Sequence, residues 1–245
     1  MYRKTDKTEE RKDEKRRLIC ATAARVFAER GYHGTAVKDI TEAAGISVGT
    51  FYLYFKNKED LFETLYDEME QIVSSINQHA LTRAELHNAP ERFTRVMAST
   101  IWAYQRCRAL TKIMLIEAVG LNPRFEQKYA QLNHDSCATI EAVLSDLKAS
   151  GIVDVPDVKI AALAYQGSFN VIIYWLRNNE TGDLNDCTYP LVVFVLQGLK
   201  IAFRHEEIKQ YAADTVKDLD ANAGIFAVLM GETAASGDPA QLERK

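Results

Sequence analysis

The chain has 245 residues and a mass of 27.6 kDa, which suits one large domain or two small ones, and its 12 glycines and 5 prolines are too few for a collagen-like or low-complexity protein. No apolar run approaches the roughly 18 residues of a membrane-spanning helix, and the first residues are charged rather than apolar as in a secretory signal, so we expect a soluble cytoplasmic protein. The net charge is −4, but residues 1–60 hold 13 Lys and Arg against 10 Asp and Glu, so the two ends of the chain are expected to meet different partners.

Helices are predicted almost throughout, because apolar residues recur at intervals of three and four instead of alternating with polar ones. Residues 1–14 are expected to form a flexible, charged arm. The first helix is predicted at 15–30 and ends at Gly31, since glycine accepts the left-handed backbone that closes a helix. The residues expected to form its buried stripe are Ile19, Ala23, Val26 and Phe27.

Two short helices joined by a tight turn are predicted next. Thr35 is the expected N-cap of the first, which is closed by Gly45, and Ser47 is the expected N-cap of the second, at 48–55. A longer helix at 57–79 then connects this small bundle to the rest of the chain.

The predicted helices indicate two domains of different size. Residues 15–60 form the first and residues 80–205 the second, while residues 206–245 are expected to be an extension that starts helical and ends disordered. Further helices are predicted in the second domain at about 90–106, 109–119, 122–151, 156–178 and 188–205. The fold class is therefore all-α.

The two short helices have the spacing of a helix-turn-helix motif. The second is unusual for a buried element, because Tyr52 and Tyr54 are two residues apart and cannot both face a core. Gly49 allows the backbone to approach a phosphate or a base edge closely, and a helix start attracts anions. Hydroxyl and ammonium donors on the same side are expected from Ser47, Thr50, Lys56 and Lys58.

From near Lys15 to near Thr64 the chain closely resembles the DNA-binding segment of TetR-family transcriptional regulators. The resemblance is carried by the pattern Thr35-x4-Ile40-x2-Ala43-Ala44-Gly45-Ile46-Ser47-x-Gly49-Thr50-x-Tyr52-x2-Phe55-x-Asn57-Lys58-x2-Leu61. It implies an all-α dimer with an N-terminal three-helix helix-turn-helix bundle and a larger C-terminal helical domain for ligand binding and dimerisation.

The resemblance also implies which residues contact DNA. It puts Lys38, Val48 and Tyr52 at base edges, where Val48 offers an apolar surface to a thymine methyl group. It also implies that five residues contact phosphates: Ser47, Gly49, Thr50, Tyr54 and Lys58. Tyr54 departs from the histidine that is common at its position, although a phenol also donates to phosphate. The charged arm either adds DNA contacts or is only a solvated helix start.

A homodimer is expected to form through the helices at 156–178 and 188–205, because their apolar residues occupy more than one face. Two recognition helices about one duplex turn apart, ~34–36 Å, predict a pseudo-palindromic double-stranded DNA operator. The resemblance implies a ligand-responsive regulator, more often a repressor, that a small, largely apolar effector releases from DNA.

The C-terminal half also offers candidates for an effector pocket, since ligand sites in helical bundles are mostly apolar with a few polar groups. These candidates are Trp102, Tyr104, Phe125, Tyr129, Tyr165, Phe169, Asn170 and Trp175. The alternative is that each is simply a core residue. The segment Met114–Leu121 is similar to family members that sense fatty acyl-thioesters, which suggests an acyl-thioester or another hydrophobic compound as effector.

The competing functions are a helical-bundle enzyme and a protein-interaction module that does not bind DNA. The sequence holds no phosphate-binding loop, no nucleophile elbow, and no pair of histidines at metal-ligand spacing. Its cysteines lie far apart, as in buried, reduced thiols: Cys20, Cys107, Cys137 and Cys187. We therefore expect neither an enzyme nor a metal or cofactor.

Overall fold

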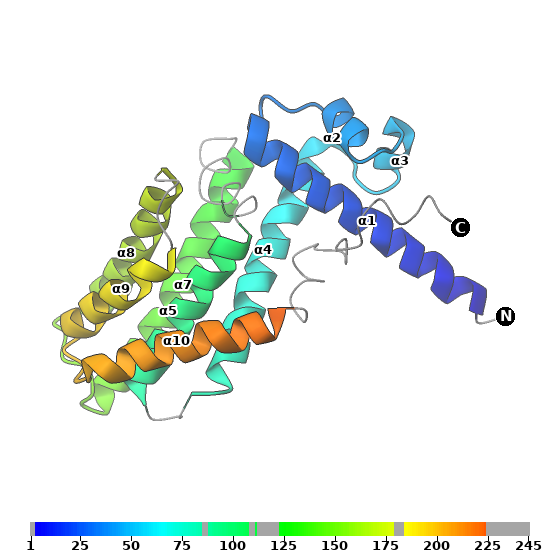
Figure 1. The fold of residues 1–245 in the computed structure, drawn as a ribbon. Helices are drawn as coiled ribbons and strands as arrows, with labels where there is room; N and C mark the ends of the chain where they lie inside the picture. Colours follow the sequence, from blue (N-terminus) through cyan, green and yellow to red (C-terminus); the bar gives the residue numbers. More distant parts are fainter. Residues whose placement is uncertain (1–2, 85–87, 108–110, 112–122, 179–183, 224–245) are drawn as a thin grey trace. The chain divides into compact units, whose positions relative to one another are not determined.

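The computed structural model describes residues 3–84, 88–107, 111, 123–178 and 184–223, and every regular element within them is a helix (Figure 1). The all-α class is thereby confirmed. The helices are α1 (Arg3–Arg30), α2 (Val37–Ala43), α3 (Val48–Tyr52), α4 (Lys58–Leu81), α5 (Ala89–Arg106), α7 (Pro123–Ala149), α8 (Val158–Asn178), α9 (Leu184–Gly198) and α10 (His205–Ala221). None of these helices is both long and apolar enough to cross a membrane. The predicted helix at 109–119 lies outside the described residues.

The chain forms two compact units, and the boundary between them falls within α4. One comprises α1, α2, α3 and the part of α4 up to Ile72, and the other runs from Val73 to Ala221. α4 is thus the helix that contributes residues to both units.

The first unit is a small bundle around α1. Its core contains the predicted stripe of α1, in which Ile19 and Phe27 are completely buried, and Phe27 meets Phe62 of α4 edge to face with ring centroids 5.6 Å apart. α1 begins at Arg3, so the prediction of a flexible arm over 1–14 is wrong for residues 3–14, the part of it that the structure describes. Lys, Arg and Glu lose little side-chain freedom in a helix, and a run rich in them continues a helix that the core has already nucleated.

Glycine and capping residues define the turns of this unit. Gly31 and Gly45 have positive φ angles of 74° and 63°, as expected for residues that close helices. Thr35, however, does not cap α2, because its hydroxyl donates to the Gly31 carbonyl oxygen at 2.8 Å. Ala36 occupies the N-cap position instead, and the carboxylate of Asp39 accepts its backbone N–H at 2.7 Å.

The second unit has a core between α5, α7, α8 and α9. Its buried residues include Met97, Ile101, Leu144, Phe169, Val192 and Leu196. Asn88 caps α5 by accepting the backbone N–H of Glu91 at 3.1 Å, and Gly151, with φ of 75°, follows the end of α7. These helix boundaries agree with the sequence signals.

The end of this unit differs from the prediction. The helix expected to reach residue 205 stops at Gly198, and the chain turns at Lys200, which has a φ of 56°. The apolar residues that suggested continuation are buried in the turn, where the Ile201 N–H donates to the Leu196 carbonyl oxygen at 2.9 Å. α10 then packs against α5 and α9, so residues 206–221 belong to the second unit and not to a separate extension.

Candidate functional site

α3 is a short, well-capped helix that exposes one of its sides. The Ser47 hydroxyl accepts the backbone N–H of Thr50 at 3.0 Å and lies 2.8 Å from the Thr50 hydroxyl, so the two hydroxyls fix each other. Phe51 is completely buried and holds α3 on the bundle, with its ring 5.7 Å from that of Phe55. The first turn of α3 is therefore fixed by its own hydrogen bonds, and the buried Phe51 holds the helix on the bundle.

The opposite side of α3 faces outward. Val48 is 43% exposed, Tyr52 is 55% exposed, and Gly49 between them is also exposed, with no close neighbour to a side chain placed there except the Ser47 hydroxyl at 3.7 Å. The surface thus combines an apolar group, a phenol and accessible backbone. Such a surface fits the floor of a major groove, where base edges offer hydrogen-bonding groups and thymine methyls.

Three further predicted DNA contacts belong to α2 and to the segment that follows α3. Lys38 of α2 is exposed and lies 3.6 Å from the Glu42 carboxylate one turn along the helix. Tyr54 is half-buried, and Lys56 is exposed while its backbone N–H donates to Asp60 at 2.9 Å. All three side chains therefore belong to the same compact unit as α3.

Lys58 departs from its prediction, because its ammonium points into the bundle. Nζ donates to the carbonyl oxygens of Tyr32 and Thr35 at 2.8 and 2.7 Å, and it lies 4.1 Å from the centre of the Tyr32 ring. Burial lowers the pKa of Lys58, and the Glu59 carboxylate partly offsets this shift. Lys58 satisfies the carbonyls between α1 and α2, so its assignment as a phosphate contact is corrected.

Leu53 is the surface residue that sequence reasoning missed. It follows Tyr52 as the C-cap of α3 and is 77% exposed, more than any other large apolar residue of the described chain. A leucine in an amphipathic pattern is normally assigned to the core, and the helix predicted at 48–55 gave no signal against this, since the early end of α3 is seen only in the structure.

The candidate effector residues fall into two groups. Tyr104 of α5 lies with its ring 6.2 Å from that of Phe169 on α8, and burial raises the pKa of Tyr104 to about 12, with the nearby Tyr129 of α7 adding to the shift. Asn170 joins the same region, since its amide donates to the Asn133 side-chain oxygen at 3.2 Å. This group, which we call the α5–α7–α8 cluster, consists of Tyr104, Tyr129, Asn133, Phe169 and Asn170.

Other candidates lie elsewhere. Trp102 is two residues from Tyr104, which puts it on a different side of α5, and its indole N–H donates to Asp220 of α10 at 2.9 Å. Tyr165 packs against Phe93, with ring centroids 5.9 Å apart, and Phe125 is buried at the start of α7. The side chain of Trp175 lies outside the described part of the structure.

Large apolar side chains are exposed along α8 and α9. On α8 they recur at helical spacing at Ile160, Leu163 and Val171, and on α9 Phe194 is 65% exposed. The helices predicted to mediate dimerisation therefore each carry apolar surface that the second unit does not cover. In the described ranges, no group of three or more His, Cys, Asp or Glu is arranged to hold a metal ion.

Comparison with known proteins gives two family matches. Residues 19–65 match the family described as bacterial regulatory proteins, tetR family, and residues 87–199 match the tetracyclin repressor-like C-terminal domain. Among curated proteins, the fatty acid metabolism regulator protein of Bacillus subtilis is 27% identical over 184 residues, which cover 74% of this chain and 93% of that protein. The transcriptional regulator AcrR of Shigella flexneri is 29% identical over 198 residues, which cover 78% of this chain and 92% of that protein.

A similar solved structure is that of the Bacillus subtilis transcriptional regulator FadR in complex with stearoyl-CoA. It has 25% sequence identity and a TM-score of 0.64, and the match covers 74% of this chain and 97% of that one.

Proposed function

Since this chain belongs to the TetR family of DNA-binding transcriptional regulators, we propose that it binds a pseudo-palindromic operator as a homodimer and that a small, largely apolar effector releases it. The observation that carries the DNA-binding part is the outward side of α3. Phe51 holds this helix on the bundle while Val48 and Tyr52 stay exposed on either side of Gly49.

Base recognition is assigned to Lys38, Val48 and Tyr52. A phenol and an ammonium donate to acceptors on base edges, and Val48 contributes apolar contact with a thymine methyl. Phosphate contacts are assigned to the side chains and amides at the start of α3, because a helix start attracts anions. They are also assigned to Tyr54, which is half-buried, and to Lys56, which is exposed; both follow the end of α3 in the chain.

Dimerisation is assigned to the exposed apolar residues of α8 and α9. Helices that carry apolar surface on the outside of a folded unit gain stability when a second copy covers them. In a two-fold dimer the two α3 helices would lie about 34–36 Å apart, one duplex turn, so the operator would have two inverted half-sites. If the operator lies between or overlaps the promoter elements, a dimer bound there would act as a repressor.

The effector is assigned to the α5–α7–α8 cluster. It combines aromatic area from Tyr104 and Phe169 with the amides of Asn133 and Asn170, which suits a mostly apolar ligand with one polar part. Support for an acyl-thioester comes from the FadR relative, whose structure contains stearoyl-CoA.

In vitro selection from random duplexes, followed by fluorescence anisotropy over a range of salt concentrations, tests this function. The expected result is an inverted repeat that is bound tightly, with affinity that falls steeply as salt rises because counterions are released. Addition of stearoyl-CoA is expected to lower the affinity. Selection that yields no common sequence would refute DNA recognition, whereas a selected operator that does not respond to any acyl-CoA would refute only the effector class.

A further inference from the structure

α10 lies beyond the end of the C-terminal family match, which stops at residue 199, and yet it is an integral part of the second unit. It packs along α5 (Figure 1), and the residues that it buries there include Ile208, Thr215 and Leu219. An additional helix with a continuous buried face has a role in the packing of its neighbours.

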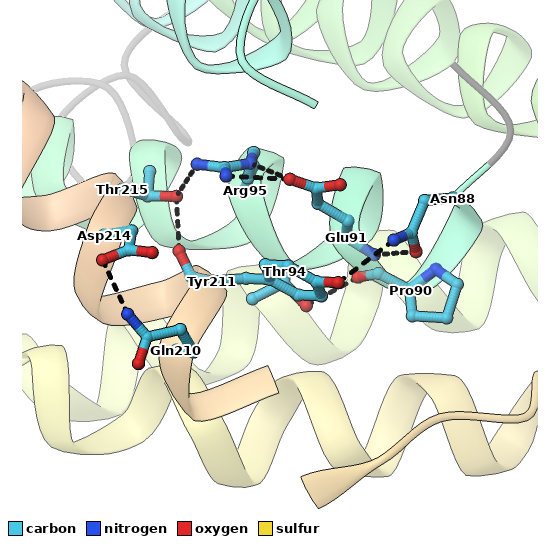
Figure 2. Close-up of polar contacts among 9 residues, drawn as sticks. All are labelled: Asn88, Pro90, Glu91, Thr94, Arg95, Gln210, Tyr211, Asp214 and Thr215. Carbon is cyan, nitrogen blue, oxygen red and sulfur yellow. Dashed lines mark hydrogen bonds and ion pairs between the residues drawn. The ribbon is translucent and has the colours of Figure 1, made fainter. Parts of the chain in front are cut away.

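The middle of α10 is joined to α5 by polar contacts (Figure 2). The Asn88 amide donates to the Tyr211 hydroxyl at 3.1 Å, and the Arg95 guanidinium donates to the Thr215 hydroxyl at 3.2 Å. Arg95 is itself held by a buried ion pair with Glu91 at 2.8 Å, one turn away on α5. These contacts fix the position of α10 along α5.

The second half of α10 reaches the end of α4. The Asp218 carboxylate lies 2.9 Å from Nε2 of His79, in the last turn of α4. It also forms an ion pair at 3.2 Å with Arg83, just after that helix. Two residues on, Asp220 accepts from Trp102 and Arg106 of α5 at 2.9 and 3.1 Å. α10 therefore joins the end of α4 to α5 through neighbouring carboxylates.

One further contact joins α4 directly to α5. The side-chain oxygen of Asn77 accepts hydrogen bonds from the hydroxyls of Ser99 and Thr100, at 2.6 and 2.9 Å. Any rotation of α4 about its axis, or sliding along it, would have to break this pair together with the Asp218 contacts. The last two turns of α4 are thus held at two points.

We propose that α10 is a clamp on the end of α4, formed by the contacts of Asp218 with His79 and Arg83, and that this clamp sets the fraction of molecules whose α4 is positioned for DNA binding. The proposal rests on the proposed function. α4 contributes to both units, and at its other end Lys58 holds the turn between α1 and α2, so its position affects the DNA-binding bundle. Loosening one end of α4 admits further arrangements, and the affinity for DNA falls with the fraction of competent molecules.

The test compares Asp218→Asn with Asp214→Asn in the full-length protein. Asp214 is the matched control, since it lies one turn earlier on α10, is exposed, and contacts Gln210 of the same helix (Figure 2). Hydrogen exchange followed by mass spectrometry reports on residues 73–83, and anisotropy reports on the affinity for the selected operator.

Asp218→Asn is expected to speed exchange at the end of α4 and to weaken operator binding about threefold to tenfold, while exchange in α7 and α8 stays unchanged. Asp214→Asn is expected to match the wild type in both measurements. Arg83→Gln removes the same contact from the α4 side, and we expect it to shift both measurements in the same direction.

Exchange at the end of α4 that is equal in the two aspartate variants would overturn the clamp. Faster exchange with unchanged or tighter operator binding would overturn its link to DNA binding. A wild-type protein that selects no operator would instead refute the proposed function, and this is seen before any variant is compared.

Discussion

Replacing Lys58 with methionine tests whether its ammonium stabilises the DNA-binding bundle or contacts DNA. The methionine keeps most of the apolar stem but removes the donors to the Tyr32 and Thr35 carbonyl oxygens and the cation above the Tyr32 ring. Both carbonyls lie in the segment between α1 and α2, which positions α2 and α3. The structure therefore predicts a loss of stability.

The size of this loss follows from the contacts. A hydrogen bond to a charged group contributes about 1.5–3 kcal/mol, and a cation–ring contact at a partly exposed site about 0.5–1 kcal/mol. Because Lys58 is only half-buried, water replaces part of what is lost. We expect Lys58→Met to lower the free energy of unfolding of the bundle by about 2–3 kcal/mol.

Lys56→Met is the matched control, because Lys56 is exposed and two residues away. It is expected to leave urea unfolding unchanged, to weaken operator binding, and to reduce the slope of log affinity against log salt by about 1.8, the value for one phosphate contact in each subunit of the dimer. For Lys58→Met the slope is expected to stay constant. The reasoning would be refuted if Lys58→Met reduced the slope by about one phosphate contact per subunit and left the unfolding free energy unchanged.

Three further predictions concern other surfaces. Tyr52→Ala is expected to weaken operator binding by about 1–3 kcal/mol. The mass of the dimer, measured by light scattering, is expected to stay unchanged. Simultaneous loss of dimerisation would show that Tyr52 is a core residue. Phe194→Glu puts a charge on the exposed face of α9 and is expected to raise the dimer dissociation constant at least about 100-fold in analytical ultracentrifugation. The monomer is expected to stay helical by circular dichroism. An unchanged dissociation constant would exclude α9 from the interface. Burial and Glu68 raise the pKa of the Cys20 thiol, so at pH 8 iodoacetamide should modify it far more slowly than Cys187, and equal rates would contradict its burial.

Local signals in the sequence predicted the helix boundaries well where one residue type decides the backbone. Gly31, Gly45 and Gly151 all adopt positive φ, because the left-handed region is costly for residues with a side chain. Ser47 caps the helix that it was predicted to cap, since its hydroxyl oxygen accepts an otherwise unpaired N–H. These effects act within a few residues, so the sequence alone contains them.

Predictions failed where distant residues decide the outcome. Lys58 was assigned to DNA from its place in the motif, but the carbonyl oxygens that it binds lie 23 and 26 residues earlier in the chain. The helix expected to reach residue 205 stops early because the turn around Lys200 buries the apolar residues that suggested continuation. Asp218 resembles an ordinary surface acid in the sequence, because its partners lie far away in the chain, in the last turn of α4 and just after it.

The buried pair of Glu91 and Arg95 has a consequence for the register of α10. Sliding α10 by one helical turn would carry Thr215 about 5.4 Å along the axis and leave one nitrogen of a buried guanidinium without its acceptor. Such a group is costly to bury unpaired, so intermediate positions are disfavoured. α10 therefore has one favoured register on α5, set by the buried guanidinium that the Thr215 hydroxyl satisfies.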